Sequence, residues 1–175
     1  MRKTLGLVAI AIACGSALPA VAASVRGPHQ AVCRAGNTPA MLVRVTGLKA
    51  ATGVLRIQSY GGAPAKFFDK GSYLDRIDVG AEGAEPIEVC VPVPREGVYA
   101  VSVRHDVNGS GKSDMRDGGG MSGNPEISLM DVMFKRRPDP ARTSIRVGKG
   151  VVPVPVTMRY VDGGSFRPVR RSAAG

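Results

Sequence analysis

The sequence lacks tryptophan and has few other aromatic residues, with four phenylalanines and four tyrosines among 175 residues. So sparse a set provides no platform on which successive nucleobases could stack, and cysteine and histidine show no zinc-binding spacing. We therefore expect no nucleic-acid partner. Beyond the N-terminal segment, no stretch is long and apolar enough to predict a membrane helix, so we also expect no transmembrane segment.

Acidic residues are scarce relative to basic ones. The chain has 14 Asp and Glu against 24 Lys and Arg, which gives a formal net charge of +10. A basic surface suits anionic partners such as lipid head groups or acidic polysaccharide, or it serves solubility alone. We favour solubility, because net charge alone bears on association and not on a specific partner.

The N-terminus has the three-part layout of a secretory signal peptide. A positive segment at residues 1–3 precedes an apolar run at 5–13, and residues 18–24 end in small side chains. We expect removal of residues 1–23 by cleavage near Ala22 or Ala23, and a periplasmic or secreted protein. The alternative is a lipoprotein site at residues 11–14, in which an acylated Cys14 would anchor the protein in the envelope.

Two cysteines, Cys33 and Cys90, lie beyond the N-terminal segment. An even count in an exported protein predicts a disulfide, and two separate buried thiols are the alternative. Closing so long a loop would stabilise the fold by roughly 4 kcal/mol in the chain-entropy model. Neither cysteine has a plausible histidine partner nearby in the sequence, so we expect no catalytic thiol.

Short runs in which apolar and polar residues alternate predict strands. They lie at residues 41–48, 53–60, 73–79, 87–93, 98–105, 143–147 and 151–160. Residues 127–134 are a further possible strand, although their apolar residues fit neither the strand period nor the helix period well. The turn residues between the first two runs predict a hairpin, and Pro153 and Pro155 predict an edge strand. Seven or eight short strands without a long amphipathic helix indicate an all-β fold, a single antiparallel β-sandwich over residues 24–162. We expect an extended lead-in at 24–39 and a basic, disordered tail at 163–175.

Residues 105–120 concentrate oxygen-bearing and turn-forming side chains. Five of them fall at positions 1, 3, 5, 9 and 12 of a calcium loop: Asp106, Asn108, Ser110, Asp114 and Asp117. Gly111 occupies position 6, where calcium loops turn sharply, and Lys112 would contribute its backbone carbonyl. This spacing predicts a Ca²⁺ site. The alternative is a polar connection in which Asp and Asn side chains cap their own backbone while Lys112 and Arg116 compensate the carboxylates.

His105 ends a predicted strand face and precedes Asp106. A histidine beside an aspartate suits acid–base chemistry, so a hydrolase that uses His105 and Asp106 is one functional alternative. Because no nucleophile elbow or diagnostic carboxylate pair accompanies them, we expect instead a partly buried histidine that bonds the loop backbone and, with Gly111, fixes the shape of the loop. The glycine run 118–120 lacks the setting of a phosphate loop and predicts a flexible connection.

The stretch 97–112 resembles the signature of the DUF2141 family of exported bacterial proteins, and residues 123–126 are similar to a segment that follows it in that family. The matching residues are Gly97, Tyr99, Ala100, His105, Asp106, Asn108, Gly111, Lys112, Gly123, Asn124, Pro125 and Glu126. The resemblance covers roughly residues 41–160 and implies a small all-β domain of immunoglobulin-like or transthyretin-like type. It implies no activity, because the function of that family is unassigned.

These observations together predict an exported cell-envelope module with a binding or structural role and no enzymatic activity. An envelope protein or an anionic surface glycan is the partner that we expect.

Overall fold

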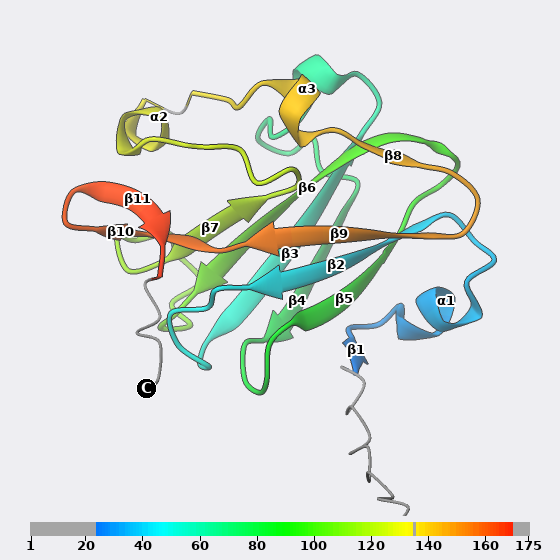
Figure 1. Ribbon diagram of the computed structural model, residues 1–175, viewed down its shortest axis with the longest axis horizontal. Coiled ribbons are helices and arrows are strands. Elements are labelled where there is room, and N and C mark those ends of the chain that lie inside the picture. The colour runs from blue at the N-terminus through cyan, green and yellow to red at the C-terminus, as the bar shows by residue number, and fades with distance from the viewer. Residues whose placement is uncertain (1–23, 135, 170–175) are drawn as a thin grey trace, which may run out of the picture.

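The computed structural model describes residues 24–134 and 136–169. The predicted signal peptide, its cleavage site and Cys14 lie outside these residues. The described chain forms eleven strands in two sheets that pack face to face (Figure 1). This confirms the predicted all-β sandwich, with more strands than the seven or so that we expected. No helix in the described ranges has the length and apolar character needed to cross a membrane.

The smaller sheet has four strands in the order β1-β5-β2-β9. Their bounds are Val25–Arg26, Ile87–Pro92, Ala40–Thr46 and Val151–Thr157. β2 and β5 are antiparallel, whereas β9 runs parallel to β2 and β1 runs parallel to β5. β9 lies at the edge, as its two prolines predicted, because a proline on an edge strand need not donate to a ladder.

The larger sheet has the order β11-β10-β7-β6-β3-β4, with β8 paired to the start of β6. The strands are Ser165–Pro168, Arg159–Asp162, Gly118–Met121, Gly97–Asp106, Val54–Gly61 and Asp75–Gly80, and β8 is Ile145–Val147. All pairs in this sheet are antiparallel.

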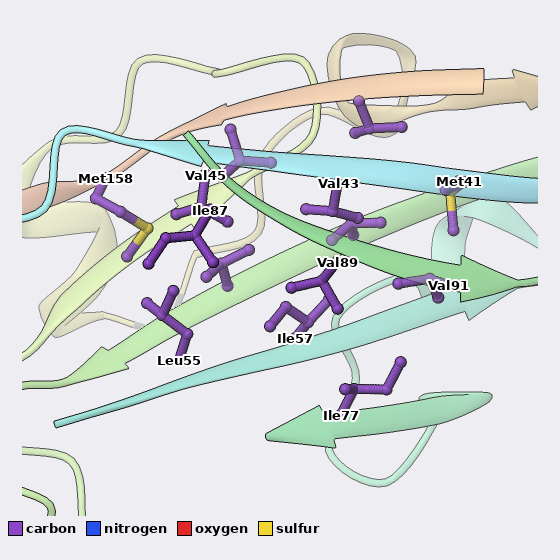
Figure 2. Packing of buried hydrophobic residues seen from close by; sticks show 14 of the residues in the cluster. Met41, Val43, Val45, Leu55, Ile57, Ile77, Ile87, Val89, Val91 and Met158 are labelled. Atoms are coloured by element: carbon purple, nitrogen blue, oxygen red, sulfur yellow. The ribbon is translucent and has the colours of Figure 1, made fainter. Parts of the chain in front are cut away.

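The core lies between the two sheets (Figure 2). Side chains at alternate positions of β2 and β5 point toward those of β3, as the period of two predicted. The residues that fill this layer include Met41, Val43, Val45, Leu55, Ile57, Ile87, Val89 and Val91. The predicted inward faces of these strands and of β6 are therefore confirmed.

Two segments predicted to be extended contain helices. The lead-in 24–39 holds α1 (Gln30–Ala35), and the expected strand 127–134 is instead α2 (Leu129–Met133). Ser128 and Asp131 explain the second difference, because each side chain bonds the backbone N–H of the other residue, the reciprocal pattern of a capping box. A 3-10 turn, η1 (Pro64–Lys66), and the short α3 (Pro140–Thr143) complete the helical elements of the described chain.

The predicted hairpin between the first two long strands is wrong, because β2 and β3 belong to different sheets. Residues 47–53 cross from one sheet to the other. The Glu85 carboxylate accepts the N–H groups of Gly47 at 2.7 Å and Leu48 at 2.9 Å, which holds the start of this crossover. A local turn pattern cannot distinguish a hairpin from a crossover, since both need the same turn residues.

The glycine run 118–120, predicted to be flexible, is the strand β7 between β6 and β10. Side chains are excluded at two of these three glycines by their neighbours: a Cβ on Gly118 would lie 2.4 Å from Tyr160 Cε1, and one on Gly120 would lie 2.7 Å from Val156 Cγ1. Glycine thus permits a close approach within the sheet.

The sandwich also continues past the boundary that we placed at residue 162. Gly163 and Gly164 both have positive φ, at 54° and 76°, which suits a two-residue hairpin turn. The chain therefore returns as β11 against β10 rather than beginning a disordered tail. Residues 170–175 of the predicted tail lie outside the described chain.

Candidate functional site

The 106–117 loop leaves the end of β6 and returns as β7 in the same sheet (Figure 1). Asp106 starts it and is almost fully buried. Its carboxylate accepts the N–H of Ser110 at 3.0 Å and that of Gly111 at 2.8 Å, and Arg104 Nη2 lies 3.4 Å away. Gly111 has φ of 74°, which a glycine adopts without strain. Asp106 therefore closes the first turn of the loop around itself.

The next oxygen-bearing side chains are bonded within the loop as well. Asn108 Oδ1 accepts the Ser110 N–H at 3.1 Å, and Asn108 Nδ2 donates to Asp114 at 3.0 Å. Ser110 Oγ donates to the Lys112 carbonyl at 3.1 Å. Asp114 accepts the Arg116 N–H at 2.7 Å, and this backbone hydrogen bond is the main cause of the lowered pKa of the Asp114 carboxyl.

Asp117, the last predicted ligand of the loop, contacts the Asp114 N–H and Arg104. Its Oδ2 accepts the Asp114 N–H at 3.3 Å and lies 3.9 Å from Arg104 Nη1. Its Oδ1 is buried with no hydrogen-bond partner, as is Arg104 Nε. Arg104 also reaches Ser113 Oγ at 2.9 Å. Arg104 is the residue of this site that sequence reasoning missed, although its position two residues before Asp106 places both on one face of β6.

The structure thus brings the six predicted calcium ligands into one loop. Most of their side-chain oxygens, however, accept hydrogen bonds from the loop's own backbone N–H groups. Within residues 24–134 and 136–169, no group of three or more His, Cys, Asp or Glu side chains is arranged to hold a metal ion. The contacts are those of the self-capped polar connection, the alternative interpretation of the same pattern. Calcium binding stays a prediction from spacing.

His105 is fully buried rather than partly buried, and its partners lie outside the loop. Nε2 is 2.8 Å from the Thr52 carbonyl, and Nδ1 is 2.6 Å from the Tyr160 hydroxyl. Since a carbonyl only accepts, we assign the proton to Nε2, and the Tyr160 hydroxyl then donates to Nδ1. Alternation on β6 turns this ring inward, toward the crossover and β10. The predicted role of His105 in shaping the 106–117 loop is therefore wrong.

Tyr160 completes this buried network. Its oxygen accepts the Lys49 N–H at 3.1 Å, and burial is the main cause that raises the pKa of Tyr160 to about 12. The hydroxyl therefore stays protonated at neutral pH. The side chains of His105 and Tyr160 thus connect the Thr52 carbonyl and the Lys49 N–H to β10. This structural role leaves neither ring nitrogen of His105 free.

The predicted disulfide is present and joins Cys33 of α1 to Cys90 of β5, with 5.8 Å between the Cα atoms. It fixes the N-terminal lead-in against the smaller sheet, since α1 contacts both β5 and β2.

The family model described as "Uncharacterized protein conserved in bacteria (DUF2141)" matches residues 43–154. This range spans more than half of the chain. The protein belongs to the DUF2141 family. No curated protein and no solved structure matches the chain significantly. The matched range of this DUF2141 protein includes the sandwich from β2 to most of β9 and the whole 106–117 loop, but excludes Cys33 and Tyr160.

Proposed function

We propose that this DUF2141 protein is an exported cell-envelope module with a binding or structural role and no enzymatic activity. The observation that carries the proposal is the state of His105, which is fully buried with both ring nitrogens bonded inside the protein. A general acid or base must come within hydrogen-bond reach of a substrate. Neither nitrogen of this ring is exposed to one.

Export is supported by two features far apart in the sequence. A disulfide between Cys33 and Cys90 is typical of an oxidising compartment such as the periplasm. The first 23 residues have the layout of a signal peptide. An envelope protein or an anionic surface glycan is the partner class that the basic balance of the chain suits.

Chemical modification of histidine tests the non-enzymatic role. The chain has two histidines, and the His29 side chain is 39% exposed, whereas His105 is 0% exposed. We expect diethyl pyrocarbonate to modify His29 in the folded protein and His105 only after unfolding, as read by peptide mass spectrometry. Modification of His105 in the folded protein would instead support the hydrolase that uses His105 and Asp106.

The mature N-terminus tests export independently. Mass spectrometry of the protein recovered from fractionated cells should show a chain that begins near residue 23 or 24 in the periplasmic or secreted fraction. A lipid-modified Cys14 would establish the anchored alternative. An intact Met1 on a cytoplasmic protein would contradict export.

Calcium binding by the 106–117 loop is the second candidate, and one observation favours it: Asp117 Oδ1 is buried without a partner, at position 12 of the loop. Calcium that binds only the folded state raises stability by about 2.7 kcal/mol at a hundredfold excess over Kd. A thermal melt with calcium and then with chelator tests this. A shift lost in Asp117→Asn would support calcium binding, and equal midpoints would assign the loop to self-capping alone.

A further inference from the structure

Large apolar side chains are exposed at five positions of the described chain: Leu74, Met115, Met130, Met133 and Phe134. Three of them belong to α2 and the residue that follows it. Met130, Met133 and Phe134 are 53%, 65% and 61% exposed. Their spacing of three and four residues places them on one side of a helical turn, and the Phe134 N–H donates to the Met130 carbonyl at 2.9 Å. Grouped apolar surface of this kind marks an interaction site.

α2 lies on the excursion between β7 and β8 and stands away from both sheets (Figure 1). Both ends of the excursion are fixed to the sandwich. Ser122 Oγ accepts the Val101 N–H of β6 at 3.0 Å and donates to the Thr143 carbonyl at 2.5 Å, and Asn124 Oδ1 accepts the Thr157 N–H of β9 at 2.7 Å. The apolar group is therefore held out from the body of the protein by an anchored support.

Arginines border this apolar group. The Arg136 guanidinium lies 5.7 Å from the centre of the Phe134 ring, and the Arg136 side chain is 68% exposed. Arg136, Arg137 and Arg142 together line a surface hollow of about 350 Å³. Arg142 is exposed and, among the described residues, its guanidinium has no hydrogen-bond or ion-pair partner. Arg136 thus lies beside Phe134, and Arg142 lies on the same excursion.

Three carboxylates, those of Glu126, Asp131 and Asp139, line the same hollow, and Arg137 is paired with Asp69. The Asp131 carboxylate accepts the N–H and hydroxyl of Ser128, at 3.0 and 2.6 Å, and lies 3.8 Å from Arg136. Asp139 accepts the Ala141 N–H at 2.9 Å. The Asp131 and Asp139 carboxylates cap helix starts, and the exposed hydrogen-bond donors of this surface include the Arg136 and Arg142 guanidinium groups.

We propose that α2 and the arginines that follow it dock the protein onto the surface of an anionic phospholipid bilayer. Met130, Met133 and Phe134 enter the boundary between head groups and acyl chains, and Arg136 and Arg142 bind the phosphates. Apolar side chains beside arginines are the composition of segments that lie in a membrane interface. Guanidinium groups match phosphate oxygens in geometry and charge. Without residues 1–23, which hold two basic residues and no acidic one, the net charge is still +8, and this charge attracts the whole protein to the same surface.

The test is cosedimentation of the purified protein with vesicles. We expect it to bind phosphatidylcholine vesicles that contain phosphatidylglycerol, to bind pure phosphatidylcholine vesicles weakly, and to be released by added salt. The double variant Met133→Ser and Phe134→Ser should weaken binding by at least about tenfold, from the lost apolar burial. Arg136→Gln and Arg142→Gln should each weaken it by about fivefold.

Matched controls separate this face from the general properties of the chain. Met115→Ser removes an equally exposed methionine, at 66%, from the 106–117 loop, and Arg34→Gln removes an exposed arginine from α1, far from α2 in Figure 1. Both should bind like the wild type. Unchanged circular dichroism and thermal midpoints establish that the α2 variants remain folded.

Equal binding by the α2 variants and the wild type overturns the proposal. So does an absence of binding to the anionic vesicles, which would leave a protein partner for this face. The proposal rests on the proposed export in one respect only, because export decides which bilayer the protein would meet in the cell. The vesicle result does not depend on cellular location, and the mature N-terminus reports export alone, so the two can fail separately.

Discussion

Tyr160 is the residue through which three separate parts of the chain are joined. Its hydroxyl accepts the Lys49 N–H and donates to His105, whose other nitrogen donates to the Thr52 carbonyl. We predict that Tyr160→Phe lowers the free energy of unfolding by about 1–3 kcal/mol, because it leaves buried polar groups without a partner. Urea unfolding measures this. Tyr73→Phe, at a partly exposed ring, is the control, and equal losses in both variants would contradict the prediction.

The same residue gives stability a pH dependence at high pH. The pKa of Tyr160 is about 12 in the folded protein against an ordinary value of 10.0. Between these two values the unfolded chain binds fewer protons than the folded one, so stability falls as pH rises. The difference in unfolding free energy between wild type and Tyr160→Phe should be constant below pH 10 and shrink from there to pH 12. A difference that stays flat across this range in urea titrations would disprove it.

Asp106 and Asp114 both bond backbone N–H groups of the loop but differ in burial. Asp106 is 3% exposed and serves two backbone N–H groups and Arg104. Asp106→Asn should lower the free energy of unfolding by about 1.5–3 kcal/mol, because the amide puts a donor against backbone donors and removes the charge beside Arg104. Asp114→Asn, at an exposed position, should change it far less. Comparable losses in urea unfolding would show that burial does not decide the effect.

That the loop oxygens lie together could be predicted from the sequence, because Asp106, Asn108 and Ser110 are close along the chain. It could not assign their partners. Whether a carboxylate binds a metal or its own backbone depends on the path of the loop, and both choices use the same spacing. The partner of His105 was even harder to predict from the sequence, since Tyr160 lies 55 residues away along the chain.

At the level of elements, β7 shows how neighbouring strands select glycine. A Cβ on Gly118 would clash with the Tyr160 ring, whereas one on Gly119 would meet only Phe166 Cζ at 3.4 Å. We predict that Gly118→Ala costs about 1–3 kcal/mol of stability through overpacking. Gly119→Ala, in the same strand, should stay within about 0.5 kcal/mol of the wild type. Thermal melts of the two variants decide the point, and similar midpoints would mean that the sheet adjusts freely.

Elements with strict alternation were predictable, and those without it were not. β2, β3 and β6 each bury every second side chain, so the sequence alone located them and their inner faces. β7 has almost no side chains to alternate, and its neighbours β6 and β10 define it as a strand. The run 151–160 alternates without a break, yet it becomes β9 in one sheet and β10 in the other. Alternation shows that one side of a strand is buried. Strands of both sheets in a sandwich are buried on one side, so alternation does not tell which sheet a strand joins.

At the scale of the whole molecule, the disulfide joins the N-terminal lead-in to the sandwich. Without it, the lead-in is held by the two-residue β1 ladder, by the contacts of α1, and by the contacts of Arg26 with Gly80 and of His29 with Asp75. With it, residues 33–90 form a closed loop that includes β2, β3 and β4.

This closure gives the last prediction. A bridge with a sequence separation of 57 restricts the unfolded chain, so the paired variant Cys33→Ser and Cys90→Ser should lose roughly 4 kcal/mol of unfolding free energy. Because Cys90 is fully buried while Cys33 lies on a surface helix, Cys33→Ser alone under reducing conditions is the control for packing. Urea unfolding of both variants, with the oxidised wild type as reference, separates the two contributions. If the paired variant matched the oxidised wild type, the bridge would contribute nothing to stability, and its place in the fold would have to be explained by the order of strand assembly instead.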